Sequence, residues 1–197
     1  MKRMKMYWQG RKDVESIFVD PVDGLNGVRK DLLNIIPDGE SILDIGCGLG
    51  HITEIFRLAG RKNTYLGVDV NLEVITWAKN RFGDKFDLQD ANFLPYIDNS
   101  FDNCILFTVV EMLPDFRKAV EEAVRVSKKR VVIALWKTLQ DAPDKNDHGV
   151  NNVGEYCVNI NRERFLKHLN SFGYPVIAST LNSNFKTEYW MWVIKKE

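Results

Sequence analysis

Short apolar runs alternate along most of this chain with longer segments in which apolar residues recur every three or four positions. The short runs predict buried strands, and the periodic segments predict amphipathic helices that cover them. The expected strands are 41–45, 64–70, 86–88, 101–108 and 130–136. The expected helices are 50–59, a helix capped by Asn71 and a helix with Pro114 in its first turn. Such alternation predicts an α/β fold, with a parallel sheet between two layers of helices.

The last part of the chain breaks this alternation. Asn161 is a candidate N-cap for a helix that ends at Gly173, and strands are expected at 175–181 and 186–194. The connection at 182–184 is too short for a crossover, so these two strands must be antiparallel neighbours. The predicted sheet is therefore mixed, with one reversed strand from a terminal hairpin.

Two segments lie outside the regular pattern of what we interpret as one domain, 1–197. The N-terminal segment 1–37 is expected to form a helix or lid, with Leu25, Val28, Leu32 and Ile35 on its apolar face. The segment 137–160 is polar and rich in Asp and Asn. An irregular segment of this length in a compact domain is commonly functional, so we expect a substrate loop there.

Composition narrows the class of protein. The 197 residues are 45% hydrophobic and 27% charged, which is typical of a folded domain. A net charge of zero argues against nucleic acid as the main partner. The three cysteines are widely spaced, which suggests neither disulfides nor a zinc site and fits the cytoplasm. No apolar run approaches a membrane span, and the basic start lacks the apolar stretch of a secretory signal, so no membrane partner is expected.

The densest motif is DIGCGLG at 44–50, where the first strand must turn into a helix. Glycines allow the backbone to approach a ligand closely, and the helix start offers free N–H groups. The spacing is G-x-G-x-G, whereas a dinucleotide loop would need glycine in place of His51. Asp44 would repel a pyrophosphate but suits a ligand that carries an ammonium and a sulfonium.

Two further carboxylates follow the next two strands. Asp69 ends the second strand, where it can accept hydrogen bonds from both hydroxyls of a ribose. Asp90 follows the third strand and can accept from an exocyclic amine such as that of adenine. Either residue alone could instead be a helix cap. Acidic residues after three successive strands favour a binding site.

These motifs resemble the class I S-adenosylmethionine-dependent methyltransferases, close to the small ubiquinone/menaquinone methyltransferase-like (type 11) group. The matching stretches, in order, are SILDIGCGLG, YLGVDVNLEVITWAK, LQDANFLPYIDNSFD and EEAVRVSKKRVVIA. The resemblance covers about 41–135. It implies a Rossmann-like three-layer sandwich with a seven-stranded, mostly parallel sheet in the order 3-2-1-4-5-7-6 and strand 7 antiparallel. Residues 128–130 depart from the family's proline-glycine turn before the fifth strand.

The resemblance also implies S-adenosylmethionine as the cofactor and assigns parts of it to matched positions. The loop residues would line the methionine end, Asp69 would hold the ribose, Asp90 and Ala91 the adenine beside Val70, and the end of the fourth strand would lie beneath the methyl group. The expected cofactor contacts are Asp44, Gly46, Cys47, Gly48, His51, Asp69, Val70, Asp90, Ala91, Phe107 and Thr108.

Methyl transfer is an in-line displacement from an activated sulfonium, so alignment matters most and a general base is optional. The candidates for a base are His51, Glu111 and His148. Donors in the polar loop around His148 are expected to be solvated, so no metal is predicted. The fourth strand is followed by TVVE rather than a [DN]-PP-[YFW] motif, which disfavours methylation of nucleic-acid bases and favours a small-molecule acceptor.

Two other functions stay open on the sequence. The lack of an obvious base permits a non-catalytic partner or regulatory subunit that binds S-adenosylmethionine. A nicotinamide-dependent oxidoreductase could use a similar sheet, although His51 and the acidic loop entrance oppose it.

Overall fold

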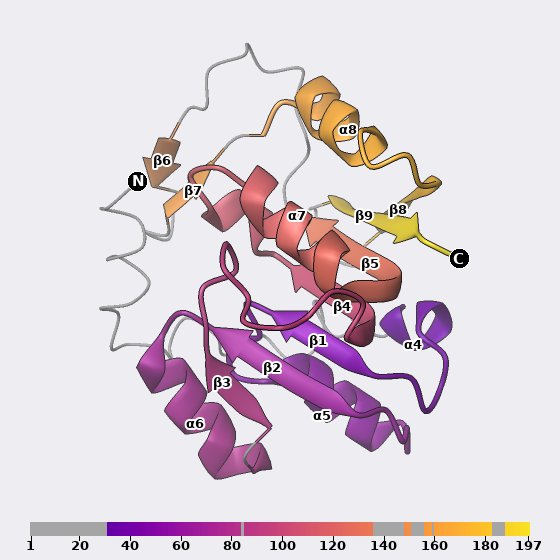
Figure 1. The fold of residues 1–197 in the computed structure, drawn as a ribbon. Coiled ribbons are helices and arrows are strands. Elements are labelled where there is room, and N and C mark those ends of the chain that lie inside the picture. The colour runs from indigo at the N-terminus through magenta and orange to yellow at the C-terminus, as the bar shows by residue number, and fades with distance from the viewer. Residues whose placement is uncertain (1–30, 84, 136–147, 151–155, 159, 183–187) are drawn as a thin grey trace.

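The computed structural model describes residues 31–83, 85–135, 148–150, 156–158, 160–182 and 188–197. Its main sheet has seven strands in the order β3-β2-β1-β4-β5-β9-β8 (Figure 1). They are β1 (Ile42–Ile45), β2 (Tyr65–Asp69), β3 (Phe86–Leu88), β4 (Phe101–Phe107), β5 (Ser127–Leu135), β8 (Val176–Asn182) and β9 (Glu188–Lys195). The first five are parallel, and β9 is antiparallel to both β5 and β8. The predicted order, with its reversed last strand, is confirmed.

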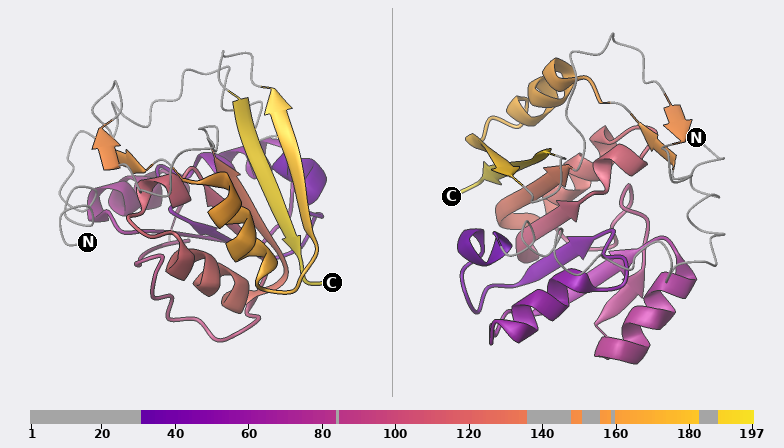
Figure 2. Two further views of the ribbon diagram at one scale, coloured as in Figure 1. Left: turned by 90° about the horizontal axis from the view of Figure 1, so that it is seen from above. Right: turned by 180° about the vertical axis from the view of Figure 1, so that it is seen from behind.

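Helices cover both faces of the sheet and complete the three predicted layers. One face carries α4 (Leu32–Ile35), α5 (His51–Leu58) and α6 (Leu72–Phe82), and the other carries α7 (Arg117–Val126) and α8 (Arg162–Asn170) (Figures 1 and 2). Side chains of β4 alternate between the two cores: Cys104 and Leu106 pack with α7 and α8, and Ile105 and Phe107 with the other three helices. Both faces of the strand are buried, which explains its continuous apolar sequence.

The terminal hairpin forms as predicted. Asn161 caps α8 by accepting a hydrogen bond from the backbone N–H of Arg164 at 2.9 Å. Strands β8 and β9 lie side by side at the edge of the sheet (Figure 2). Trp192 of β9 is buried, and its ring meets that of Phe165 of α8 edge-on, with centroids 5.0 Å apart. This contact fixes the hairpin against the helical layer.

Two predicted boundaries are wrong. A 3-10 turn, η1 (Val110–Met112), follows β4, and α7 begins only at Arg117, so Pro114 precedes the helix. Strand β5 begins at Ser127 directly after α7, so 128–130 is strand rather than a turn. Charged residues are tolerated in this strand because Lys129 and Arg130 pair with Glu40, with N–O distances of 2.9 and 2.7 Å.

The segment 137–160 is more regular than expected, because β6 (His148–Val150) and β7 (Tyr156–Val158) form an antiparallel pair. Strands of three residues carry too little hydrophobic periodicity to be found in a sequence. Strand β7 packs against η1. The rest of this segment, and residues 1–30 of the expected N-terminal helix or lid, lie outside the described residues; in the described part of 1–37, α4 begins at Leu32 and ends at Ile35. Among the helices that the structure describes, none has the length and apolar character to cross a membrane.

Candidate cofactor-binding site

The expected site residues follow four neighbouring strands that end at the same edge of the sheet. In the parallel strands, Ile45 of β1 lies opposite Val68 of β2, and Asp69 lies opposite Leu88 of β3. Asp44 lies in β1, and the glycine loop 46–50 and His51 follow that strand. The remaining expected residues come at or just after the ends of β2, β3 and β4. This is the edge at which open α/β sheets bind ligands. We call it the carboxyl edge.

The glycine loop has a backbone that other residues would strain. Gly46, Gly48 and Gly50 have φ values of 74°, 54° and 79°, in the left-handed region. A Cβ on Gly46 would also lie 2.4 Å from Cγ2 of Val109, closer than real atoms come. Val109, two residues beyond β4, therefore requires a glycine opposite it. No local sequence pattern indicates this residue, because its partner lies 63 positions earlier in the chain.

Asp69 connects the glycine loop to the start of α6. Its Oδ2 accepts a hydrogen bond from the backbone N–H of Gly48 at 3.2 Å, and its Oδ1 accepts from that of Asn71 at 3.0 Å. Asn71 itself caps α6, so the helix does not need Asp69 as its cap. Burial raises the pKa of Asp69, although the backbone N–H groups of Asn71, Gly48 and Val70 oppose the shift.

Asp44 lies in the interior rather than at the entrance of the loop. Its side chain is 1% exposed, and its Oδ2 accepts a hydrogen bond from the Tyr65 hydroxyl at 2.5 Å. Burial and the charge of Asp44 raise the pKa of Tyr65. Burial raises the pKa of Cys47 too, and the charges of Asp69 and Asp44 add to that shift. Both carboxylates therefore act on the loop, and direct contact of Asp44 with a ligand stays a prediction.

Asp90 begins a tight turn after β3. Its Oδ1 accepts hydrogen bonds from the backbone and side-chain nitrogens of Asn92, at 3.0 and 2.9 Å. Its backbone carbonyl accepts from the N–H of Phe93 at 2.9 Å. Ala91 is partly buried and packs against the core cluster of α7 and α8. The turn gives the half-buried carboxylate a defined position at the carboxyl edge.

The end of β4 holds an unusual backbone conformation. Phe107 is 5% exposed, and Thr108 after it has a φ of 56° although it is not a glycine. Its backbone N–H donates to the carbonyl of Ala134 at 2.8 Å, which helps to hold this conformation. Such strain costs of order 1–3 kcal/mol and tends to gather at functional sites. No sequence pattern predicts the strained backbone of Thr108.

The three candidates for a base come to different places. His51 is the first residue of α5, next to the glycine loop and partly buried. Glu111 is 2% exposed and lies in η1, the 3-10 turn that contacts β7. His148 begins β6, and its side chain lies outside the described part. A catalytic role for each stays a prediction. Among the described residues, no three His, Cys, Asp or Glu side chains are grouped to hold a metal ion.

Comparison with known proteins agrees with this geometry. Residues 43–135 match the family model described as a methyltransferase domain. This region is therefore a methyltransferase domain, and it is similar to the class I S-adenosylmethionine-dependent methyltransferases. Family and fold indicate S-adenosylmethionine as the cofactor of this methyltransferase domain, which confirms the predicted cofactor.

Two relatives and one solved structure illustrate the similarity. The malonyl-[acyl-carrier protein] O-methyltransferase of Pectobacterium atrosepticum is 33% identical over 113 residues, which are 56% of this chain and 44% of that protein. The ubiquinone/menaquinone biosynthesis C-methyltransferase of Rickettsia akari is 34% identical over 118 residues, 53% and 48% of the two chains. The match thus spans less than half of each relative. The methyltransferase domain also shares the fold of a SAM-dependent methyltransferase from Aquifex aeolicus, with a TM-score of 0.66, 21% identity, and coverage of 93% and 100%.

Proposed function

We propose that this chain transfers the methyl group of S-adenosylmethionine to a small-molecule acceptor. The observation that supports this most is the hydrogen bond from the Gly48 backbone to Asp69. It ties the glycine loop to the carboxylate at the end of β2, which has about four acceptor sites, and the backbone N–H groups of Gly48, Asn71 and Val70 do not fill all of them. Helix capping does not need this connection, because Asn71 performs it. A ribose with two adjacent hydroxyls fits such an acceptor.

The glycine loop suits the methionine end of the cofactor. Gly46 and Gly48 remove side chains from the path of a ligand, and Cys47 and His51 flank that path. The carboxylates of Asp44 and Asp69 both act on Cys47, so the loop lies in a negative field. Such a field favours an ammonium and a sulfonium over a phosphate. We assign the loop to these two cationic groups.

The turn at Asp90 suits the adenine end. Its carboxylate is a candidate acceptor for the exocyclic amine, and Ala91 and Val70 offer small apolar surfaces to the ring. Ala91 and Val70 are both partly exposed, as a residue that contacts a ligand must be. Asp69, between this turn and the glycine loop, would then hold the ribose that joins the two ends of the ligand.

The acceptor would approach from the end of β4. S-adenosylmethionine supplies an activated methyl group when bound, so the protein must mainly align the acceptor with it. Alignment can contribute about 7–11 kcal/mol to catalysis. We assign Phe107 and Thr108 to the floor beneath the methyl group, and the segment 137–160 to the acceptor side, because β7 packs on η1 next to them. If the acceptor must lose a proton, a base adds about 10²–10⁴-fold, with His51, Glu111 and His148 as candidates.

The class of acceptor is proposed from composition and relatives together. The two relatives named above are an O-methyltransferase and a C-methyltransferase, so their family does not determine the methylated atom. The balanced charge and the absence of a [DN]-PP-[YFW] motif favour a small molecule over nucleic acid. We propose a cytoplasmic location, which the wide spacing of the cysteines supports.

Calorimetry with S-adenosylmethionine and S-adenosylhomocysteine tests the proposal, followed by transfer of a radiolabelled methyl group into a pool of small metabolites. We expect both ligands to bind and label to enter the pool. Failure of both to bind at millimolar concentration would contradict the proposal. Binding without transfer would favour the non-catalytic binding partner, and NADH binding detected by fluorescence would favour the oxidoreductase.

A further inference from the structure

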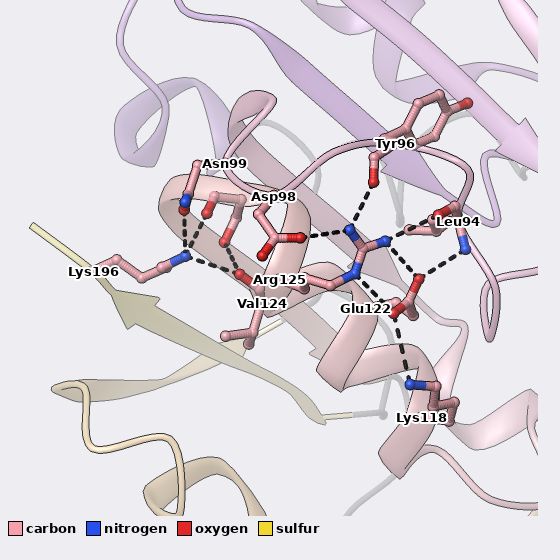
Figure 3. Close-up of polar contacts among 10 residues, drawn as sticks. Leu94, Tyr96, Asp98, Asn99, Lys118, Glu122, Val124, Arg125 and Lys196 are labelled. Atoms are coloured by element: carbon pink, nitrogen blue, oxygen red, sulfur yellow. Dashed lines mark hydrogen bonds and ion pairs between the residues drawn. The ribbon is translucent and has the colours of Figure 1, made fainter.

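The loop between β3 and β4 contains Asp90 near its start and is held to α7 by two charged side chains, Glu122 and Arg125 (Figure 3). Neither residue belongs to the predicted cofactor contacts. Because the loop follows the proposed adenine-binding residue, whatever fixes it also influences that residue. We call Glu122 and Arg125 together the α7 clamp.

Arg125 binds three points of the loop with one guanidinium group. Nη1 donates to the carbonyl of Tyr96 at 2.7 Å and to Oδ1 of Asp98 at 2.8 Å. Nη2 donates to the carbonyl of Leu94 at 3.0 Å. The planar fork of arginine has five N–H donors, whereas the ammonium of lysine has three and cannot make these bonds and those to Glu122 together.

Glu122 holds both Arg125 and the loop. Its Oε1 accepts from Nε of Arg125 at 3.0 Å, and its Oε2 accepts from Nη2 at 2.8 Å. Oε2 also accepts from the backbone N–H of Leu94 at 2.9 Å. The Glu122 side chain is 10% exposed, and the hydrogen bond from Arg125 lowers its pKa. The backbone N–H and the backbone carbonyl of Leu94 thus both form hydrogen bonds with the Glu122–Arg125 ion pair.

Leu94 is directly connected to the turn that holds Asp90. Asp90 accepts hydrogen bonds from Asn92 and from the N–H of Phe93, so residues 90–93 form a closed turn that ends one position before Leu94. The Leu94 side chain is 5% exposed in the core beside α7. No helix or strand of the described chain lies between β3 and β4 to hold the turn otherwise. The clamp is therefore its nearest rigid support.

We propose that Arg125 is a positioning residue for the adenine end of the cofactor. With Glu122 it immobilises Leu94 and, through the turn, the carboxylate of Asp90. That carboxylate distinguishes a base with an amine from one with a carbonyl, because only the amine donates to it. The proposal rests on the proposed function, and it predicts that selection for adenine depends on a side chain that never touches the ligand.

The test compares two ligands, S-adenosylhomocysteine and S-inosylhomocysteine, whose purine carries a carbonyl in place of the amine. Calorimetry on the full chain should show the wild type preferring the first ligand by about tenfold, which corresponds to about 1.4 kcal/mol. In Arg125→Lys this preference should fall below about threefold, mainly through weaker binding of S-adenosylhomocysteine. A general loss of stability would weaken both ligands equally. The matched control is Arg117→Lys, on the same helix, where arginine pairs with exposed Asp115 away from the loop; its preference should stay that of the wild type.

Each contrary result has a separate meaning. If Arg125→Lys kept the wild-type preference, the positioning role would be wrong. A wild type that binds both ligands equally would contradict the proposal as well, because Asp90 would then not distinguish the amine of adenine from a carbonyl. A wild type that binds neither would overturn the proposed function itself. Should Arg125→Lys fail to fold, Glu122→Gln removes the charge that holds the guanidinium and should show the same loss of preference.

Discussion

The two ends of the central strands carry carboxylates in opposite situations. At the amino ends of β1, β4 and β5, Glu40 accepts from Lys129 and Arg130, and Asp102 pairs with Lys129 at 3.1 Å. Burial opposes ionisation of Glu40 and Asp102, but hydrogen bonds and the neighbouring positive charges prevail and lower the pKa of each. We call this group the amino-edge cluster.

At the carboxyl edge, Asp69 has no such partner. Within the described part of the chain it accepts only from backbone N–H groups, and burial raises its pKa. Glycines with positive φ and the strained Thr108 surround the same edge. The carboxyl edge therefore lowers the stability of the folded state, whereas the ion pairs of the amino-edge cluster raise it.

Position on the sheet decides what an acidic residue does here. Where a lysine or arginine pairs with the carboxylate, the ion pair links strands that are distant in the sequence. Where backbone amides alone hold it, its charge stays available to a ligand. Substitutions at the two edges should therefore separate stability from binding.

Gly46→Ala should have the largest effect, and it affects both properties. The left-handed φ costs about 1–2 kcal/mol for a residue with a Cβ. Contact with Val109 adds about 1–3 kcal/mol of overpacking. Urea unfolding should show this loss, and calorimetry should show loss of S-adenosylhomocysteine binding. Val109→Ala is the control, and the double variant should recover the overpacking part. Wild-type binding by Gly46→Ala would show that the loop backbone does not form the site.

Asn71→Ala should have a smaller effect and shows that the carboxyl edge has structural parts too. The Asn71 side chain accepts from the backbone N–H groups of Glu73 and Val74, at 2.9 and 3.3 Å. Its loss should lower the free energy of unfolding by about 1 kcal/mol. Its backbone N–H still donates to Asp69, so affinity for S-adenosylhomocysteine should change little. A large loss of affinity would make Asn71 part of the binding site.

Glu40→Gln should lower the free energy of unfolding by about 0.5–1 kcal/mol, because the cluster is a partly exposed network. Affinity for S-adenosylhomocysteine should equal that of the wild type, since the change lies at the opposite edge. Thermal unfolding and calorimetry on the same preparation measure the two quantities. A weakened affinity would mean that the edges are not independent.

The smallest effect concerns acid pH. The pKa values of Glu40 and Asp102 are lowered in the folded chain, so both carboxylates stabilise it fully above their ordinary pKa values of 4.5 and 3.8. This stabilisation is lost as the pH falls through the lowered pKa values. The raised pKa of Asp69 acts in the opposite direction, because its protonation favours the folded chain. Urea unfolding below about pH 4.5 should thus show a shallower decline in Glu40→Gln than in the wild type. Equal slopes would contradict the paired state of Glu40.

The sequence predicted the sheet because parallel strands bury both faces and so have continuous apolar sequences, as in β4. It predicted that the candidate residues lie at one edge of the sheet, because parallel strands bring their carboxyl ends together. It missed the start of β5, because Lys129 is stabilised in this strand by Glu40, 89 positions away, and by Asp102. The hydrogen bond of Tyr65 to Asp44 and the contact of Val109 with Gly46 also join distant positions, and no local pattern encodes them.

The most direct measurement compares Asp69→Asn with Asp102→Asn, two identical substitutions at opposite edges of the sheet. Two hydroxyl hydrogen bonds to a charged acceptor contribute roughly 1.5–3 kcal/mol each, so Asp69→Asn should weaken S-adenosylhomocysteine binding by about 100-fold. Asp102→Asn should bind it as the wild type does and lose stability instead. If calorimetry showed unchanged affinity in Asp69→Asn, the assignment of the carboxyl edge as the cofactor site would be wrong.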